Sequence, residues 1–292
     1  MPARITSTGL LIAPEPAELF EYPAHIERAS LDALPRQPGI YIFRDDVGAP
    51  LYIGKSVNIR SRVLAHLRTP QEARMLKQSR RVEFRRTAGE IGALLLESRL
   101  IKELQPVHNK KLRRTREMCT LRLAEGAGMP AIAYARELDF TTTEGLYGLF
   151  ATRRAALETL RALIDAHQLC AVVSGLEAGR PGRPCFARQL HRCHGACIGS
   201  ETPAAHAARL REALEPMRVA VWPYAGAVGL IEESDGWRQM HVIDHWFHVG
   251  TLDDGDKLRL KRPARRVFDI DSYQILVRPL LQRTLPVVPV TL

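Results

Sequence analysis

The sequence contains no long hydrophobic run. Among its 292 residues, no apolar stretch approaches the roughly 20 residues that a helix needs to cross a bilayer. The only early apolar run, at residues 9–13, is too short for a secretory signal peptide. The chain also lacks internal repeats and low-complexity tracts. We therefore expect a cytoplasmic protein with no membrane partner, long enough for about two domains and a sizeable core.

Cysteine is scarce, and its count is odd. Five cysteines in a basic chain without a leader argue against a disulfide scaffold, and the isolated Cys119 is predicted to be a packing residue. The others are separated by fourteen, seven and three residues, without the C-x-x-C pairs typical of structural zinc: Cys170, Cys185, Cys193 and Cys197. Four thiolates still make a complete set for zinc or an iron–sulfur cluster, so metal and no metal both stay open.

Acidic residues are outnumbered, and the excess of positive charge is local. The net charge is +10, and residues 51–120 alone carry seventeen Lys and Arg against six Asp and Glu. A phosphodiester backbone is the natural partner of such a surface. The densest cluster, a candidate DNA contact, consists of Lys110, Lys111, Arg113, Arg114 and Arg116. A run of charge is more often solvated than specific, so that alternative remains.

The pattern from residue 39 to residue 68 predicts a β-hairpin followed by a helix. Apolar β-forming residues at 39–43 and 51–54 flank turn-forming residues, and Tyr41 and Tyr52 would face each other. A phenol can hold a proton near a reacting oxygen, and nearby cations would lower its pKa. On the helix, Arg62 and His66 are four residues apart, on a face that would meet a phosphate. The alternative is core tyrosines beside a solvated basic helix.

A carboxylate interrupts the next predicted helix. Residues 89–104 have helical apolar spacing, and Glu97 lies inside the apolar stripe. Burying a carboxylate costs several kcal/mol unless it is paired, hydrogen-bonded or bound to a metal. Glu97 is therefore a candidate ligand for a hard cation such as Mg²⁺. The alternative is a buried pair between Glu97 and an arginine.

These residues, in this order, resemble the GIY-YIG endonuclease family over residues 31–116. The resemblance is carried by six polar positions, which are Tyr41, Tyr52, Lys55, Arg62, Glu97 and Asn109. His66 departs from the UvrC version of the motif, where tyrosine is usual, but other members carry histidine there.

The resemblance implies a mechanism. A single Mg²⁺, or Mn²⁺, would bind Glu97, polarise the scissile phosphate and stabilise the leaving oxygen. One of the two tyrosines would help to deprotonate the attacking water, and Arg62 would offset charge on the phosphoryl oxygens. Lys55, His66 and Asn109 would orient the phosphate, the water or a tyrosine.

The segment that follows is similar to the excinuclease UvrC. Residues 150–152, a helical run at 153–167 and the cysteine-containing stretch 185–197 carry the likeness, and in UvrC such cysteines are associated with an iron–sulfur cluster. The chain is similar to short UvrC homologues along nearly its whole length. It shows no acidic second nuclease domain, no helix-hairpin-helix pairs and no UvrB-binding hairpin, which implies a single incision site.

The implied role is incision of double-stranded damaged DNA on the 3′ side of a lesion, in nucleotide excision repair, on a UvrB–DNA complex formed with UvrA. Two alternatives remain. One is a restriction or mobile-element nuclease on the same domain, which would read its own target sequence without UvrB. The other is a non-catalytic DNA-binding or cluster-carrying accessory protein, which would bind without cleavage.

The expected fold class is α+β: a small mixed α/β nuclease domain, then a helical cysteine-containing segment and a β-rich tail. The expected segments are an extension at 1–30, the nuclease at 31–117, connecting strands at 118–146, the helical region at 147–218 and the tail at 219–292.

Within the tail, strands are predicted at 227–231, 239–249 and 273–277, with Asp235-Gly236 as a hairpin turn. The strand pattern favours an ordinary sheet over a metal site at His241, His245 and His248. Asp269 and Asp271 are expected to be surface positions of an alternating segment.

Overall fold

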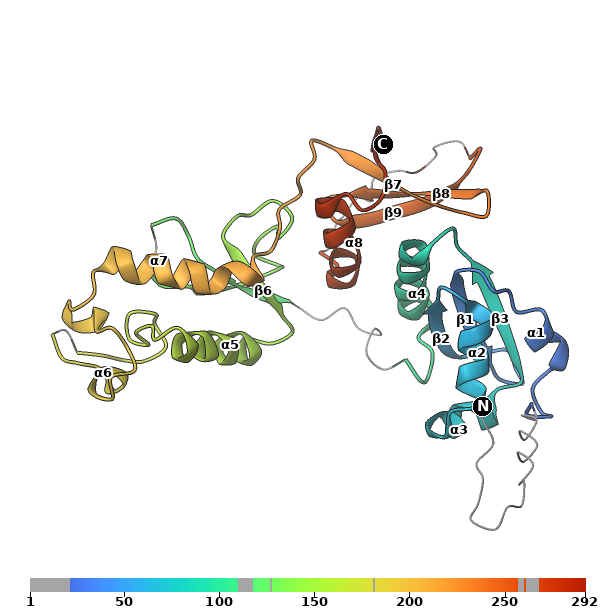
Figure 1. Ribbon diagram of the computed structural model, residues 1–292, viewed down its shortest axis with the longest axis horizontal. Helices are drawn as coiled ribbons and strands as arrows, with labels where there is room; N and C mark the ends of the chain where they lie inside the picture. The colour runs from blue at the N-terminus through green and yellow to red at the C-terminus, as the bar shows by residue number, and fades with distance from the viewer. Residues whose placement is uncertain (1–21, 110–117, 127, 181, 257–259, 261–267) are drawn as a thin grey trace, which may run out of the picture.

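The computed structural model describes residues 22–109, 118–126, 128–180, 182–256, 260 and 268–292 (Figure 1). As predicted, the chain is α+β. The helices are α1 (Arg28–Asp32), α2 (Ile59–Leu67), α3 (Ala73–Gln78), α4 (Glu90–Leu104), α5 (Arg153–Ala166), α6 (Phe186–Gln189), α7 (Pro203–Leu214) and α8 (Ile270–Gln282). Short 3₁₀ turns are η1 (Pro70–Glu72), η2 (Ala196–Ile198) and η3 (Glu215–Met217). None of the helices in these ranges is long and apolar enough to span a membrane.

The strands form three antiparallel sheets, whose orders are β2-β1-β3, β5-β4-β6 and β10-β7-β8-β9. The first contains β1 (Gly39–Arg44), β2 (Pro50–Ser56) and β3 (Arg81–Arg86); the second β4 (Cys119–Arg122), β5 (Ala131–Tyr134) and β6 (Leu146–Phe150). The third contains β7 (Ala227–Ser234), β8 (Trp237–Asp244), β9 (Phe247–Asp253) and β10 (Val287–Val290).

The predicted hairpin and helix at the start of the chain are confirmed. Both faces of the central strand β1 are buried, because a helix covers each of them: Ile40 and Ile42 pack toward α4, and Tyr41 and Phe43 pack toward α2. Asn58 caps the start of α2, because its side chain accepts a hydrogen bond from the Ser61 N–H at 3.0 Å. The alternation of β1 therefore places Tyr41 on the face that α2 covers.

The helical cysteine region packs α5 and α7 against its own small sheet. The predicted helical run at 153–167 is confirmed as α5. Both α5 and α7 are preceded by a threonine, Thr152 or Thr202, whose hydroxyl caps the first turn. Cys119 is buried in this core, as predicted. This region extends away from the nuclease fold, at the left of Figure 1.

The C-terminal region corrects two of the predicted strands. The Asp235-Gly236 turn is confirmed, with φ values of 52° and 73°. The expected single strand at 239–249 is wrong, because His245 and Trp246 adopt positive φ and turn the chain from β8 into β9. Residues 273–277 lie in helix α8 instead of a strand, because Tyr273, Leu276 and Leu280 bury a helical stripe.

Asp269 and Asp271 also differ from expectation. They belong to the start of α8, and both carboxylates bind the Lys102 ammonium of α4, at 2.6 and 2.7 Å. Helices α4 and α8 lie side by side, although about 170 residues separate them in sequence (Figure 1). These aspartates therefore join two regions of the chain and are not ordinary surface positions of an alternating strand.

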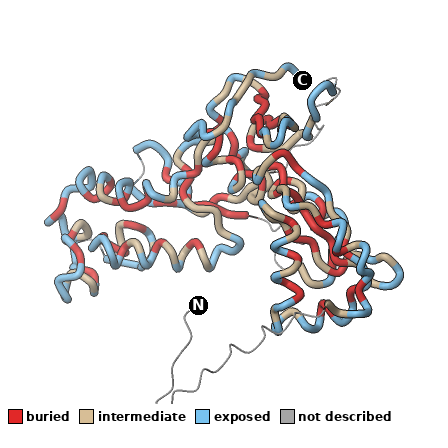
Figure 2. Tube along the Cα trace, turned by 45° about the vertical axis from the view of Figure 1, so that its right-hand side comes forward, coloured by how far each residue is buried: buried red, intermediate tan, exposed pale blue. Residues whose placement is uncertain are grey.

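Helix α4 is shared between two hydrophobic cores. Leu100 and Ile101 pack with Ile40, Ile42 and Ile53 of the first sheet. Leu95, on another face of the helix, belongs to the core of the C-terminal region. Buried and exposed positions alternate along α4, and in Figure 2 the buried stretches of the chain lie toward the inside of each packed region. The helix that carries Glu97 is therefore held between the nuclease sheet and the C-terminal sheet.

Candidate active site

Two tyrosines meet between the first sheet and α2. Tyr41 is 1% exposed, and its ring centroid lies 6.2 Å from that of Tyr52 on the neighbouring strand. Burial raises the pKa of both phenols, and the nearby Arg62 lowers them without offsetting that effect. The expectation that cations would lower these pKa values is therefore wrong, and both side chains are neutral phenols at pH 7.

Gly54 makes room for this pair. A Cβ atom at Gly54 would lie 2.2 Å from the Tyr41 hydroxyl oxygen and 2.9 Å from Cε1 of Tyr52. Any larger residue at this point of β2 would displace the Tyr41 hydroxyl. The glycine that follows Tyr52-Ile53 is thus a steric requirement of the site.

His66 connects Tyr41 to a carboxylate that the sequence analysis missed. The imidazole is 3% exposed; its Nε2 lies 2.6 Å from the Tyr41 hydroxyl, and its Nδ1 forms a short contact with Glu72. Burial lowers the pKa of His66, although Glu72 raises it, so the ring is neutral at pH 7. Neutral His66 donates a hydrogen bond from Nδ1 to Glu72 and accepts one from the Tyr41 hydroxyl at Nε2.

Arg62 and His66 therefore do not share a phosphate-facing surface. His66 points into the core with Ile59, Val63 and Leu67, whereas Arg62 is exposed and interacts with the Tyr41 hydroxyl. The apolar spacing of α2 could have shown this, because His66 falls seven residues after Ile59 on the buried stripe. Glu72 lies on η1 and belongs to no recognisable sequence motif, so only the fold shows its contact with His66.

Glu97 lies on α4 opposite the edge strand. Its Oε1 accepts a hydrogen bond from the Lys55 N–H at 3.0 Å, and burial raises the pKa of the carboxyl. Among the residues that the structure describes, no arginine forms an ion pair with Glu97, and Oε2 receives no hydrogen bond. A desolvated carboxylate with an oxygen left over fits a hard cation better than it fits the buried arginine pair considered above.

Lys55 and Asn109 are placed by other contacts. The Lys55 ammonium pairs with Glu90 in the first turn of α4. The Asn109 side chain accepts from the Ile53 N–H and donates to the Ile53 carbonyl, both at 2.8 Å. It thus completes the hydrogen bonding of the edge strand β2, next to Tyr52. The basic tract of Lys110, Lys111, Arg113, Arg114 and Arg116 lies outside the described residues.

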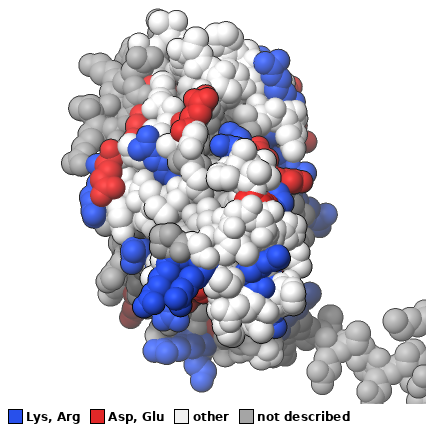
Figure 3. All heavy atoms as spheres, turned by 90° about the vertical axis from the view of Figure 1, so that its left-hand side faces the viewer, with Lys and Arg blue, Asp and Glu red and all other residues white. Residues whose placement is uncertain are grey.

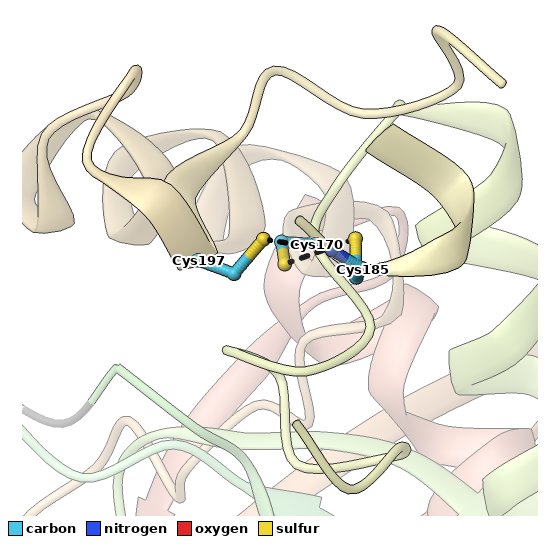
Figure 4. A group of neighbouring side chains, drawn as sticks. All are labelled: Cys170, Cys185 and Cys197. Carbon is cyan, nitrogen blue, oxygen red and sulfur yellow. Dashed lines mark hydrogen bonds between the residues drawn. The ribbon is translucent and has the colours of Figure 1, made fainter. Parts of the chain in front are cut away.

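The four predicted cysteines converge in the helical region. The Sγ atoms of Cys170, Cys185 and Cys197 all lie within 4.8 Å of one another (Figure 4). Cys193 adds a fourth sulfur, 3.5 Å from Cys185 Sγ. A neutral His206 buried beside them accepts a hydrogen bond from the Cys170 N–H at 3.1 Å.

The pKa values of Cys170, Cys185 and Cys197 are shifted in different directions. Burial raises the pKa of Cys170, but hydrogen bonds from the Val172 and Val173 backbone and from Cys197 outweigh it and lower the pKa overall. Burial raises the pKa of Cys185 and Cys197, and a thiolate at Cys170 adds to that rise. Four sulfurs this close fit a metal centre, because a shared cation would favour the thiolate form of all four.

Comparison with known proteins defines the class first. The family model "UvrC-like GIY-YIG domain" matches residues 37–110, "UvrC/Cho excinuclease, middle domain" matches 118–216, and "Excinuclease Cho C-terminal domain" matches 227–292. The protein is thus a nuclease of the GIY-YIG class.

The relatives then define the family. Excinuclease cho of Escherichia coli O157:H7 is 50% identical over 96% of this chain and 94% of its own length, and that of Salmonella typhi is 49% identical over 91% and 90%. The chain belongs to the Cho excinuclease family. UvrABC system protein C of Ruegeria is 32% identical over 64% of this chain and 29% of its own.

Among solved structures, the magnesium-bound GIY-YIG domain of UvrC from Thermotoga maritima is 32% identical over 28% of this chain and 93% of that chain, with a TM-score of 0.26.

Proposed function

We propose that this protein is a Mg²⁺-dependent (or Mn²⁺-dependent) endonuclease that incises double-stranded damaged DNA on the 3′ side of a lesion, on a UvrB–DNA complex formed with UvrA. The observation that carries the proposal is the meeting of Tyr41, Tyr52 and Arg62 with a desolvated Glu97, which pairs with no arginine in the part of the chain that the structure describes. The curated relatives named excinuclease cho support the repair role.

The side chains of the site suggest how the water is activated. Tyr41 donates its proton to His66 Nε2 and can accept one from the attacking water on the same oxygen. The Glu72 carboxylate stabilises the imidazolium that then forms. Tyr52, 6.2 Å from Tyr41 between ring centroids, is the alternative base and otherwise helps to hold the water. Arg62 balances charge on the phosphoryl oxygens.

Glu97 is the residue that would hold the cation. When bound there, Mg²⁺ supplies Lewis-acid stabilisation of the scissile phosphate and its leaving oxygen. The hydrogen bond from the Lys55 N–H fixes Oε1 of Glu97, and it thereby also sets the direction in which Oε2 points. Asn109 holds the strand that carries both Lys55 and Tyr52.

DNA affinity is proposed to come from basic side chains of two regions, the nuclease and the helical cysteine region. In the nuclease domain these are the basic residues of the tract at 110–116. In the cysteine region they are the exposed Arg180, Arg183 and Arg192, which lie in a segment without Asp or Glu from residue 178 to residue 200. Figure 3 looks from the side of α6 and shows Lys and Arg gathered over the lower half of that face. Such contacts favour a polyanion without reading its sequence.

Replacing Glu72 tests the proton path. Glu72→Gln removes the anion that raises the pKa of His66, so His66 becomes a weaker base, and we expect single-turnover nicking at pH 7 to fall about tenfold or more. The fall of the nicking rate at acidic pH, which reflects protonation of His66, should move to lower pH for the same reason. Rates across pH 5 to pH 8 with saturating DNA measure both effects.

The matched control for that experiment is Gln71→Ala, an exposed neighbour on the same 3₁₀ turn. A Glu72→Gln protein with the rate and pH profile of Gln71→Ala would remove Glu72 from the proton path.

The cysteines are proposed to hold an iron–sulfur cluster, with zinc as the alternative. Protein prepared without oxygen should be brown and contain iron and acid-labile sulfide, and Cys193→Ala should lose them. Cys119→Ala is the control, because Cys119 is buried outside the four-cysteine group. Cys193→Ala should also lower stability and DNA binding without changing the chemistry at Glu97. Stoichiometric zinc without iron would reject the cluster, and metal-free protein of full stability would reject both.

The function itself is tested on a duplex with one defined lesion. We expect a nick on the 3′ side of the lesion that requires UvrA, UvrB and Mg²⁺ and disappears in EDTA. Cutting at a fixed sequence without UvrB would favour a target-reading nuclease, and binding without cleavage would favour an accessory protein.

A further inference from the structure

Helix α4 has no N-terminal cap of its own. Its N-cap residue is Gly89, which has no side chain to bind the free N–H groups of the first turn. The N–H groups of Ile91 and Gly92 instead donate to the two carboxylate oxygens of Glu232 on β7, at 2.9 and 2.7 Å. These are the two amides that a capping Asp or Ser normally satisfies from the N-cap position. About 140 residues of chain separate the helix from its cap.

Glu232 is fixed in its place. It is 6% exposed, and His241 of β8, which is 0% exposed, contacts its Oε2 through Nε2 at 3.0 Å. The other nitrogen of His241 lies 2.9 Å from the Thr251 hydroxyl of β9. Burial raises the pKa of Glu232, but His241 and the two amides outweigh it, so the carboxylate is ionised. An anion at the first turn also suits the positive end of the helix dipole.

The start of α4 is shaped to admit this carboxylate. A Cβ atom at Gly89 would lie 2.3 Å from Glu232 Oε1, and one at Gly92 would lie 2.8 Å from His241 Cε1. Gly92 is inside the helix, where glycine is about 1 kcal/mol worse than alanine for stability. Room for the cap explains why small residues stand at both positions.

Three further contacts hold α4 against the C-terminal region. The Ala88 N–H donates to the Gln239 side-chain oxygen at 2.8 Å, just before the helix. Leu95 packs into the C-terminal core, and Lys102 binds Asp269 and Asp271 near the other end. The helix is thus fixed at its start, middle and end by residues beyond position 226.

From this geometry we propose that Glu232 is a positioning residue for the nuclease: it caps the helix that carries Glu97, so the C-terminal region sets where that carboxylate lies. The proposal rests on the proposed role of Glu97. Glu97 lies seven positions after Glu90, about 10 Å along the helix, so fraying of the first two turns would release Glu97 from the Lys55 N–H.

The test moves the cap from Glu232 to the helix itself, in the full-length protein. Glu232→Ala should raise about tenfold both the Mg²⁺ concentration for half-maximal nicking and the Mg²⁺ dissociation constant measured by calorimetry without DNA, as loss of a supporting contact does at other metal sites. The double variant Gly89→Asp with Glu232→Ala should restore the wild-type values, because Asp supplies the acceptor and the removed carboxylate leaves room for it. The Gly89 backbone is extended, which Asp adopts readily.

The matched control is Glu233→Ala, an exposed neighbour on the same strand, which should behave as wild type. Two outcomes would overturn the proposal: an unchanged Mg²⁺ requirement in folded Glu232→Ala protein, or a defect that Asp at position 89 does not repair. If Glu232→Ala fails to fold, repair of folding by Gly89→Asp supports the cap and failure of repair rejects it. The Glu97 variant below tests the proposed function separately.

Discussion

Glu97→Gln is expected to abolish Mg²⁺-dependent nicking while leaving the fold intact. The amide keeps the size of the side chain and can still accept the Lys55 N–H, but it loses the anion that would hold the cation. Because burial raises the pKa of Glu97, the change to a neutral group removes a desolvated charge and does not destabilise the helix. Nicking of a lesion-bearing duplex with UvrA and UvrB measures the loss.

The same pKa shift gives the pH dependence of the wild-type protein. A proton and a cation compete for Glu97, and the proton competes better where the pKa is raised. We expect the Mg²⁺ requirement to rise as the pH falls toward that pKa, above the ordinary 4.5 of a glutamate. The exposed Glu103 on the same helix provides the control variant Glu103→Gln. Near-wild-type nicking by folded Glu97→Gln protein would remove Glu97 from the site.

The local parts of the site could be predicted from the sequence. Periodicity predicts the hairpin, α2 and α4, which the structure confirms, and a carboxylate in an apolar stripe makes Glu97 a candidate ligand without a structure. What the sequence could not give are contacts between distant segments. Glu232 reaches α4 across the whole helical cysteine region. Glu72 is only six residues from His66 in sequence, but α2 ends between them, so their contact depends on how the chain turns from α2 into η1.

Two misjudgements have a common physical reason. The run at 273–277 is rich in β-branched and aromatic residues, yet packing against α4 makes it a helix, because tertiary contacts outweigh weak propensities. The tyrosine pKa values were expected to fall beside cations, yet burial outweighs Arg62. Charge can be counted in a sequence, but the depth at which a side chain is buried depends on the assembled fold.

Arg62→Ala is expected to slow nicking about 10²-fold or more while weakening DNA binding only modestly. Arg62 is exposed on α2 and interacts with the Tyr41 hydroxyl, so it can meet the phosphate and hold the phenol at the same time. A charge fixed in advance at the phosphate acts mainly on the transition state, where negative charge on the phosphoryl oxygens is redistributed. Separate measurements of the single-turnover nicking rate and of the DNA affinity distinguish the effect on catalysis from the effect on binding.

Two further variants make the test specific. Arg62→Lys keeps the charge but loses the planar fork that can bind Tyr41 and a phosphate oxygen together, so it should recover only part of the rate. Arg74→Ala removes an exposed arginine of α3 outside the site and should lower affinity slightly without changing the rate per bound complex. Equal losses of affinity and rate in Arg62→Ala, matched by Arg74→Ala, would make Arg62 a simple backbone contact and leave the phosphoryl charge to Glu97 and its cation.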